Sequence, residues 1–290
     1  MNYWFLSLAI LAGAVMAGLV PTPQDKVVFM DVGQGDAILL ERGTRQVLID
    51  GGPDRKILER LSEEMPFFDR KIEVVMLTHP DTDHLAGLLE VLNKYEIGLV
   101  LLPKVADATQ LQEEWLNLLL AKNVLYRFAE RGQVIEMAGL TINILNPTRE
   151  MPVMAGKRLN DYSVATKVYM DEISFLLPGD LEQTRESWLV NNERGGELAA
   201  QVLKAGHHGS KSSTSQQWLD RINPRVAVVS AGKDNRYNHP SPETLERLEG
   251  RVVLRTDQSG SVRFVKEGGR WLVGCGGKEW TKMASSCTNI

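Results

Sequence analysis

The sequence predicts an α/β fold in which two mixed β-sheets pack face to face, with helices on the outer surfaces. Three observations lead to this prediction. Short β-branched runs at residues 26–32, 36–41 and 46–50 are separated by glycine turns, which is typical of an antiparallel meander. Apolar strands then alternate with helical segments, which indicates parallel pairing with the helices outside. The second half repeats this mixture, and no linker divides the 290 residues, so we expect one main domain.

The elements after the meander follow in a regular order in each half. In the first half we expect a helix at 54–64, a strand at 73–77, a helix at 84–94, a strand at 98–102, a helix at 109–122, and strands at 124–128, 140–145, 163–170 and 173–177. In the second half we expect a helix at 181–192, a strand at 200–204, a helix at 213–222, a strand at 226–230, a helix at 242–249, and strands at 252–256 and 261–266. Two mixed halves of this kind indicate two packed sheets.

The first residues form a hydrophobic segment. Residues 1–20 carry no charged side chain and Pro21 ends the run, a length that just suffices to span a bilayer. We expect residues 1–22 to be a membrane anchor or a signal segment. A cleaved signal peptide lacks its usual basic start here, and a buried core helix is the other alternative. Anchor and signal both predict a membrane-anchored or secreted protein whose catalytic domain, residues 24–272, lies outside the cytoplasm.

Composition limits the class of protein, the kind of surface that could contact nucleic acid and the kind of metal ligand. Hydrophobic residues make up 43% and charged residues 24% of the chain, as in ordinary globular proteins with a substantial core. The net charge of −4 excludes a protein-wide basic surface, so any contact with nucleic acid must come from a local patch. Both cysteines, Cys275 and Cys287, lie in the Gly- and Ser-rich tail at 273–290. They either form a terminal disulfide or stay unpaired, and thiolate ligation of a metal in the core is not expected.

Histidines mark the predicted functional site. Each of the five follows an apolar strand in a polar loop: His79, His84, His207, His208 and His239. The carboxyl ends of strands are where α/β sheets bind ligands, so these loops can converge on one site. The segment from His79 to His84 packs four metal-competent side chains, with Asp81 and Asp83 between the histidines, into six positions. This density suits a pair of divalent cations, whereas helix capping would explain only one aspartate.

The motif His79-x-Asp81-x-Asp83-His84 resembles the H-x-H-x-D-H signature of the metallo-β-lactamase superfamily, with the second histidine replaced by aspartate. D-V-G-Q-G-D at 31–36 precedes it and K-A-G-H-H-G-S at 204–210 follows it. Together the three motifs resemble the C-terminal domain of the ComEC family of DNA-uptake competence proteins, over residues 26–270. The resemblance implies a metallo-β-lactamase-type four-layer αββα sandwich and a metal-dependent hydrolase.

The resemblance also implies roles for further residues. Asp180 would bridge two metal ions and act in catalysis with Asp83 and His84, while His207 or His208, and His239, would add ligands. Asp50 would orient the metal-binding loop with help from Asp36, although a plain strand turn is the alternative for the Asp50-Gly pair. The middle histidine of the superfamily has no counterpart, and residues 160–163 stand in its place. Oxygen ligands favour harder ions, so we expect two ions of manganese or zinc, with magnesium as a third option.

A hydroxyl-rich loop at 209–214 offers groups that bind phosphate. It combines serines, an ammonium group and the start of a predicted helix. The predicted phosphate-binding residues are Asn160, Ser163, Ser210, Lys211, Ser212 and Ser213. Residues 204–236 contain six basic residues and two acidic ones: Lys204, Lys211, Arg221, Arg225, Lys233 and Arg236 against Asp220 and Asp234. A solvated face with a serine N-cap is the alternative.

The motifs together predict a phosphodiesterase or nuclease that acts on DNA, with single-stranded DNA favoured, through a metal-bound hydroxide. Besides nucleic acid, the expected partners are a membrane, through residues 1–20, and a separate membrane channel protein. One alternative is a hydrolase of the same fold that acts on a small ester, lactone or lactam. The other is a non-catalytic DNA-binding or membrane module.

Overall fold

The computed structural model describes residues 24–105, 109–151, 159–193 and 196–276. Within these ranges the strands form two sheets, of eight and seven strands. The first sheet has the spatial order β15-β14-β1-β2-β3-β4-β5-β6. Its strands are β1 (Lys26–Phe29), β2 (Ile38–Arg42), β3 (Arg45–Ile49), β4 (Lys71–Met76), β5 (Glu96–Leu102), β6 (Tyr126–Phe128), β14 (Val262–Glu267) and β15 (Arg270–Cys275). Both sheets are mixed, as the sequence predicted.

The second sheet runs in the order β13-β12-β11-β10-β9-β8-β7. Its strands are β7 (Val134–Met137), β8 (Leu140–Ile144), β9 (Thr166–Met170), β10 (Ile173–Leu177), β11 (Val202–Lys204), β12 (Val226–Val229) and β13 (Val252–Arg255). The strands β7 to β10 pair as antiparallel neighbours, whereas β10 to β13 pair in parallel. The parallel strands need helical crossovers, and these crossovers bring the carboxyl ends of β10, β11 and β12 to one edge.

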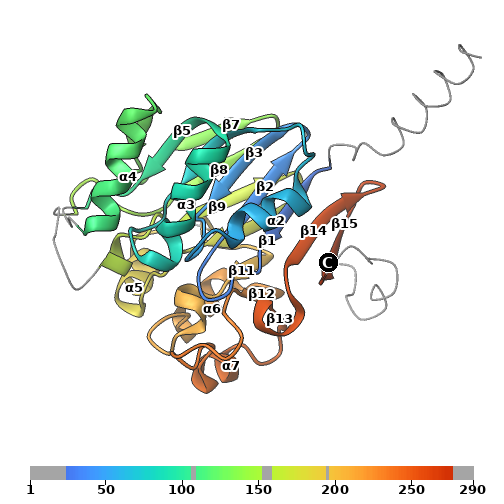
Figure 1. The fold of residues 1–290 in the computed structure, drawn as a ribbon. Coiled ribbons are helices and arrows are strands. Elements are labelled where there is room, and N and C mark those ends of the chain that lie inside the picture. The colour runs from blue at the N-terminus through green and yellow to red at the C-terminus, as the bar shows by residue number, and fades with distance from the viewer. Residues whose placement is uncertain (1–23, 106–108, 152–158, 194–195, 277–290) are drawn as a thin grey trace, which may run out of the picture.

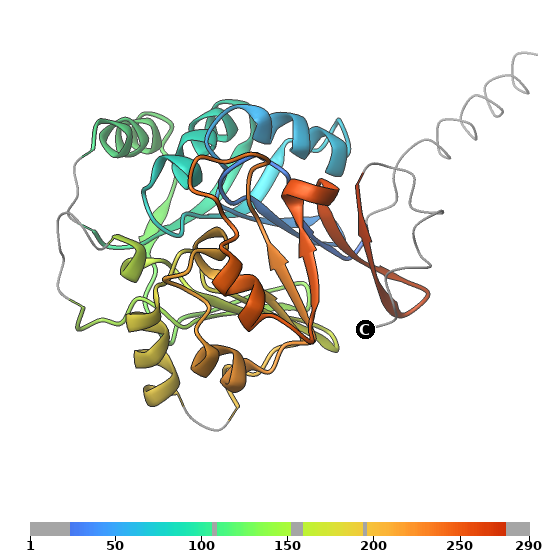
Figure 2. The same ribbon diagram turned by 90° about the horizontal axis from the view of Figure 1, so that it is seen from below.

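The helices cover the two outer faces, so the molecule has four layers (Figures 1 and 2). Apolar side chains on one cover pack against the first sheet, in a cluster that contains Leu61, Leu88 and Trp115. The helices of this cover are α2 (Lys56–Glu64), α3 (Thr82–Lys94) and α4 (Gln110–Ala121). Leu189 and Trp218 belong to the matching cluster on the second sheet. The helices of the second cover are α5 (Gln183–Asn192), α6 (Gln216–Ile222) and α7 (Pro242–Arg247).

The centre of the core lies between the sheets. Phe29 and Phe264 from the first sheet meet Phe175 from the second, with ring centroids 5.2 to 6.5 Å apart. All three side chains are fully buried. Aromatic pairs at this separation add to the free energy gained by burying their area, so they fix how the two sheets sit on each other. The αββα sandwich is therefore confirmed.

Two strands lie where the sequence analysis expected none. The edge strand β7 (Val134–Met137) alternates exposed and half-buried residues, and so has no continuous apolar run to reveal it. The hairpin β14–β15 pairs Val262 with Cys275, so the last strand extends three residues beyond the expected domain end at 272. The predicted membrane segment lies outside the described residues. In the part that the structure describes, no helix is both long and apolar enough to cross a bilayer.

Candidate metal centre

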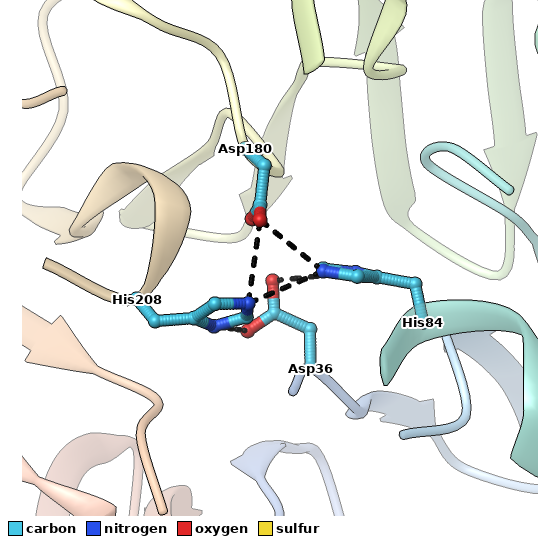
Figure 3. Close-up of side chains that lie close together, drawn as sticks. All are labelled: Asp36, His84, Asp180 and His208. Carbon is cyan, nitrogen blue, oxygen red and sulfur yellow. Dashed lines mark hydrogen bonds and ion pairs between the residues drawn. The ribbon is translucent and has the colours of Figure 1, made fainter. Parts of the chain in front are cut away.

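The polar loops meet where strands of both sheets end. His79 follows β4 and leads into α3, whose first turn carries Asp83 and His84. Asp180 follows β10, and the two histidines of the 204–210 motif follow β11. The chain therefore builds one site from residues of both sheets, as Figure 3 shows for four of its members.

One carboxylate oxygen lies at the centre of this site. Asp180 Oδ2 is 3.3 Å from His84 Nε2 and 3.3 Å from His208 Nε2. The same oxygen is 3.9 Å from the Nε2 atoms of both His79 and His207. Four imidazole nitrogens thus lie within 3.9 Å of a single carboxylate oxygen.

Hydrogen bonds hold the imidazole rings of His84 and His208 at Nδ1, the nitrogen on the side away from Asp180. His84 Nδ1 lies 2.8 Å from Asp50 Oδ2, and the Asp50 carboxylate also accepts bonds from the Thr78 amide and hydroxyl at 2.7 Å. His208 Nδ1 lies 3.0 Å from the Ser230 carbonyl oxygen. With Nδ1 bonded in this way, Nε2 is the nitrogen left for a metal. The two Nε2 atoms are 3.3 Å apart, so both face the same space.

Asp36 belongs to the outer side of the site. Its carboxylate, together with His84, Asp180 and His208, forms a buried group of potential metal donors within 4.8 Å. However, it approaches the Nδ1 atoms, at 3.9 Å from that of His84 and 3.5 Å from that of His208. Its other strong contact is Lys204 Nζ, 2.5 Å from Oδ2. We therefore interpret Asp36 as an orienting residue, the role that the sequence analysis gave it.

Glycine at position 35 allows this close approach. The Asp36 amide donates to the Asp83 carbonyl oxygen at 3.2 Å. A Cβ on Gly35 would lie 2.1 Å from that same oxygen, and the residue has φ +135°, a backbone region that favours glycine. The D-V-G-Q-G-D motif thus places a carboxylate against the start of α3.

The aspartates of the His79–His84 motif contact imidazoles. Asp81 occupies the N-cap position of α3, but its side chain makes no capping hydrogen bond. Its Oδ2 lies instead 3.6 Å from His79 Nε2. Asp83 Oδ2 is 3.2 Å from His208 Nε2. Helix capping therefore does not explain these carboxylates, and each lies against an imidazole nitrogen of the site instead.

The two remaining histidines lie nearer the surface. The His207 side chain is 27% exposed, and its ring centroid is 5.5 Å from that of His239. His239 Nδ1 is buried without a hydrogen-bond partner in the described part of the chain. His207 and His208 both have left-handed backbone conformations, with φ of 47° and 54°. Such conformations cost energy and concentrate at functional sites.

The predicted phosphate-binding residues are only partly accessible. Ser163 and Ser213 are fully buried, and the Ser163 hydroxyl accepts a bond from the Asp180 amide at 3.1 Å. The Ser212 hydroxyl and the Asn160 amide group both donate to Glu182, at 3.3 and 3.4 Å. The Ser210 hydroxyl lies 3.0 Å from that of Ser212, and Lys211 is exposed. An acidic side chain therefore sits among the hydroxyls expected to bind phosphate.

The protonation of the histidines and of Asp180 depends on their burial and on the charged groups beside them. Burial alone would lower the pKa of His84 and of His208. The nearby carboxylates outweigh this effect and raise both pKa values well above the usual range. These carboxylates are Asp180 for both rings, Asp50 for His84 and Asp36 for His208. Burial alone would raise the pKa of Asp180, but His208, His84 and Lys204 lower it well below its usual value. Metal ligation requires unprotonated imidazoles, so metal uptake must release protons.

These side chains fit a divalent metal. His79 Nε2 is buried and has no hydrogen-bond partner among the described residues, although it lies within 4 Å of the Asp81 and Asp180 carboxylates. An unpaired buried nitrogen beside carboxylates is costly unless a ligand satisfies it. Imidazole nitrogens and carboxylate oxygens in this number suit zinc or manganese.

Sequence reasoning missed the role of Lys204. It was counted with the basic surface residues, yet it is fully buried. It donates to the Gly179 carbonyl oxygen at 3.0 Å and lies 3.4 Å from Asp180 Oδ1. The signal was its position at the end of the apolar strand β11, immediately before the histidines, where a surface lysine is not expected. The exposed basic charge of residues 204–236 is therefore smaller than the count of six suggested.

Two side chains that brace the 210–215 loop were also missed. Glu186 on α5 accepts from the amides of Thr214 and Ser215 at 2.6 and 2.9 Å, and the Thr214 hydroxyl accepts from the Gly206 amide at 2.9 Å. Arg247 on α7 donates to the Thr214 carbonyl oxygen at 2.8 Å. Neither residue lies in a recognisable motif, because each is brought to the loop by helix packing.

Comparison with known proteins identifies relatives of this chain. ComE operon protein 3 of Bacillus subtilis is 31% identical over 263 residues, which cover 83% of this chain and 33% of that protein. Competence protein ComA of Neisseria gonorrhoeae is 27% identical over 255 residues, covering 84% of this chain and 33% of that protein. These relatives are ComEC-family competence proteins, as the motifs predicted. The chain spans about a third of their length.

The fold has counterparts among solved structures. The metallo-beta-lactamase fold protein YhfI from Bacillus subtilis superposes with a TM-score of 0.53 at 12% identity, covering 79% of this chain and 96% of that one. This likeness concerns the fold alone. The family model described as "Metallo-beta-lactamase superfamily" matches residues 30–233, which is more than half of the chain. The chain therefore belongs to the metallo-beta-lactamase superfamily.

Proposed function

We propose that the protein is a metal-dependent phosphodiesterase that cleaves DNA. The observation that carries this proposal is the convergence of four Nε2 atoms, from His79, His84, His207 and His208, on Asp180 Oδ2 within 3.9 Å. A carboxylate surrounded by imidazoles in this way would take part in holding divalent ions. Sites with two such ions are typical of enzymes that cleave phosphate esters.

The chain offers enough donors around Asp180 to hold two divalent ions. The side chains that would hold them are His79, Asp81, Asp83, His84, Asp180, His207 and His208, with His239 at the rim. Bound divalent ions supply positive charge that polarises a phosphoryl oxygen and lowers the pKa of water. Manganese and zinc both fit this mixed set of imidazoles and carboxylates, with magnesium as a third option.

The protein residues around the donors perform three tasks. Asp50 and the Ser230 carbonyl oxygen hold His84 and His208 with Nε2 facing inwards. Lys204 neutralises carboxylate charge that would otherwise repel a phosphodiester. The Asp83 side chain is 30% exposed and lies 3.2 Å from His208 Nε2, so it can reach both solvent and a substrate at the site and take a proton from an attacking water.

The choice of DNA as substrate rests on the relatives. The name of one relative, Competence protein ComA, carries the word "competence". A further relative from Haemophilus influenzae, 31% identical over 248 residues, is named Recombination protein 2. We infer that this chain, which matches a third of their length, contributes to DNA uptake by cutting a DNA strand. On this proposal it acts outside the cytoplasm, beside a membrane channel supplied by another part of the system, and single-stranded DNA is the favoured substrate.

Hydrolysis assays with exchanged metals test the proposal. The full chain is treated with a chelator, then resupplied with manganese, magnesium or zinc, and offered single-stranded DNA and bis-p-nitrophenyl phosphate. We expect cleavage of both substrates only after metal is returned, and no cleavage by Asp83→Ala. A small lactone and a lactam serve as control substrates.

The outcomes separate the alternatives. Turnover of the lactone or lactam but not of the phosphodiesters would favour a small-molecule hydrolase. Binding of DNA without cleavage under any metal would favour a non-catalytic binding module. Equal activity of Asp83→Ala and the unchanged protein would remove the proposed role of the His79–His84 motif.

A further inference from the structure

A pocket opens beside the metal centre. It has a volume of about 380 Å³, and its walls include Asp83, Thr82, Gln34, Arg236 and Tyr237. This volume is within the range of sites for small organic groups, roughly 300–1,000 Å³. Because Asp83 is both a wall of the pocket and a contact of His208, a group held here would lie next to the reacting phosphate.

An exposed aromatic ring forms one wall. The Tyr237 side chain is 49% exposed, so its ring is accessible to a ligand from solvent. The ring stacks on that of His239, with centroids 5.7 Å apart and planes at 24°. One face of Tyr237 is therefore supported from beneath by a histidine next to the metal centre.

A guanidinium group accompanies this ring. The carbon Cζ of Arg236 lies 4.8 Å from the Tyr237 ring centroid, and Nη2 donates to the Tyr237 hydroxyl at 2.5 Å. This contact uses one of the five N–H donors of the side chain. Arg236 is exposed, so its remaining donors can bind a phosphate oxygen in the fork geometry that arginine favours.

The loop that carries both side chains is held in place. Asn235 Oδ1 accepts from the amides of Tyr237 and His239, at 3.2 and 3.0 Å. Asn235 Nδ2 donates to the carbonyl oxygens of Gly232 and His239, at 2.9 and 2.6 Å. The Gly232 amide in turn donates to Gln34 Oε1 at 3.1 Å. A loop fixed in this way loses little conformational entropy when it binds a ligand.

We propose that this pocket binds one nucleotide of a single-stranded DNA substrate, next to the cleaved phosphodiester, with the base stacked on Tyr237 and a flanking phosphate on Arg236. The inference rests on the proposed function and adds how the protein would bind its substrate. A stacked base and a phosphate-binding cation side by side are the two elements by which proteins bind single strands. Every base has an aromatic face, so the pocket would accept any sequence. A duplex presents no free base face, so the pocket favours unpaired strands.

Binding to two oligonucleotides tests the proposal. One is a thymidine oligonucleotide of about 12 nucleotides, within the usual site size of single-strand binders, and the other has the same length and phosphates but abasic sugars. Fluorescence anisotropy of the full chain in the presence of EDTA gives Kd for each without cleavage. In parallel, the manganese-loaded protein gives KM and kcat on both.

We expect Tyr237→Ala to raise Kd and KM for the thymidine oligonucleotide by about tenfold, the order of one lost base stack. Its Kd for the abasic oligonucleotide should stay unchanged. Tyr237→Phe keeps the ring and should bind like the unchanged protein. Arg236→Ala should weaken binding of both oligonucleotides equally and reduce the slope of log affinity against log salt. Tyr126→Ala, at an exposed tyrosine on β6, is the matched control and should change nothing.

The results decide the inference separately from the proposed function. Equal affinities of Tyr237→Ala and the unchanged protein for the thymidine oligonucleotide would overturn the subsite, even if DNA is cleaved. A loss of affinity that is the same for the abasic oligonucleotide would also overturn it, because base stacking would then contribute nothing. Failure of the unchanged protein to cleave DNA would contradict the proposed function, and the anisotropy measurements would still decide the subsite.

Discussion

Replacing Lys204 with methionine would remove an ammonium group from between two buried carboxylates. Its Nζ lies 2.5 Å from Asp36 Oδ2 and 3.4 Å from Asp180 Oδ1, and all three side chains are at most 3% exposed. Methionine keeps a similar length without charge. Removing one partner of a buried ion pair leaves an uncompensated charge and costs about 3–5 kcal/mol, so we expect the free energy of unfolding to fall by that amount at pH 7.

The pH dependence of this loss follows from the two pKa values. Burial alone would raise the pKa of Asp36, but Lys204 and His208 outweigh it and lower the pKa to about 2. A carboxyl with a lowered pKa contributes stability above its unfolded pKa, roughly 3.9, and loses that contribution as the pH falls through 2. In Lys204→Met only His208 and His84 still oppose the effect of burial, so Asp36 takes up a proton more readily. The loss of unfolding free energy caused by Lys204→Met should therefore be smaller at pH 4 than at pH 7.

Urea unfolding followed by circular dichroism, with EDTA present, measures the effect. Lys71→Met, at an exposed position that begins β4, is the control, and a surface change of this kind should stay within about 0.5 kcal/mol. A loss below about 1 kcal/mol for Lys204→Met, or an equal loss at pH 4 and pH 7, would refute the interpretation of Lys204 as the internal counter-charge of the site.

Three further predictions concern other parts of the site. His84→Ala should abolish hydrolysis and leave the circular dichroism spectrum unchanged, since it removes an Nε2 donor; residual activity above about 1% of the unchanged protein would contradict a ligand role. Lys211→Ala should weaken DNA binding and flatten its salt dependence by roughly 0.7 in the log–log slope for a single strand, and an unchanged slope would exclude Lys211 from phosphate contact. Burial raises the pKa of Glu186 to about 7, so its protonated form stabilises the fold at pH 4 and this contribution is lost as the pH rises through 7. The free energy of unfolding of Glu186→Gln, measured in urea, should therefore fall less steeply between pH 5 and pH 7, and an equally steep fall would place the titrating group elsewhere.

The parts of the site that the sequence could predict are local. His79, Asp81, Asp83 and His84 lie within six positions, and their proximity follows from the chain itself. Asp180 could be placed because it ends an apolar strand, and strand ends share an edge of the sheet. In the same way the alternation of strands and helices revealed the layers before any contact was known.

The parts that could not be predicted depend on the register of distant strands. Nothing near Ser230 shows that its carbonyl oxygen orients His208, since this contact requires β11 and β12 to lie side by side in one register. The inward direction of Lys204 depends in the same way on which face of β11 looks towards the first sheet, the face that also carries Val202. Tyr237 and Arg236 lie in a loop whose path is set by Asn235, and a hydrogen-bonding pattern of this kind leaves no periodic trace in a sequence.

The sharing of the site between the two sheets has a mechanical consequence. His84 belongs to the first half of the chain, whereas Asp180 and His208 belong to the second. An ion bound by all three would cross-link the two halves of the chain, in addition to the aromatic contact of Phe29 with Phe175. Ligands that bind only the folded state slow and oppose its opening. Chelation should therefore loosen the sandwich as a whole, and protease sensitivity would then report on metal occupancy.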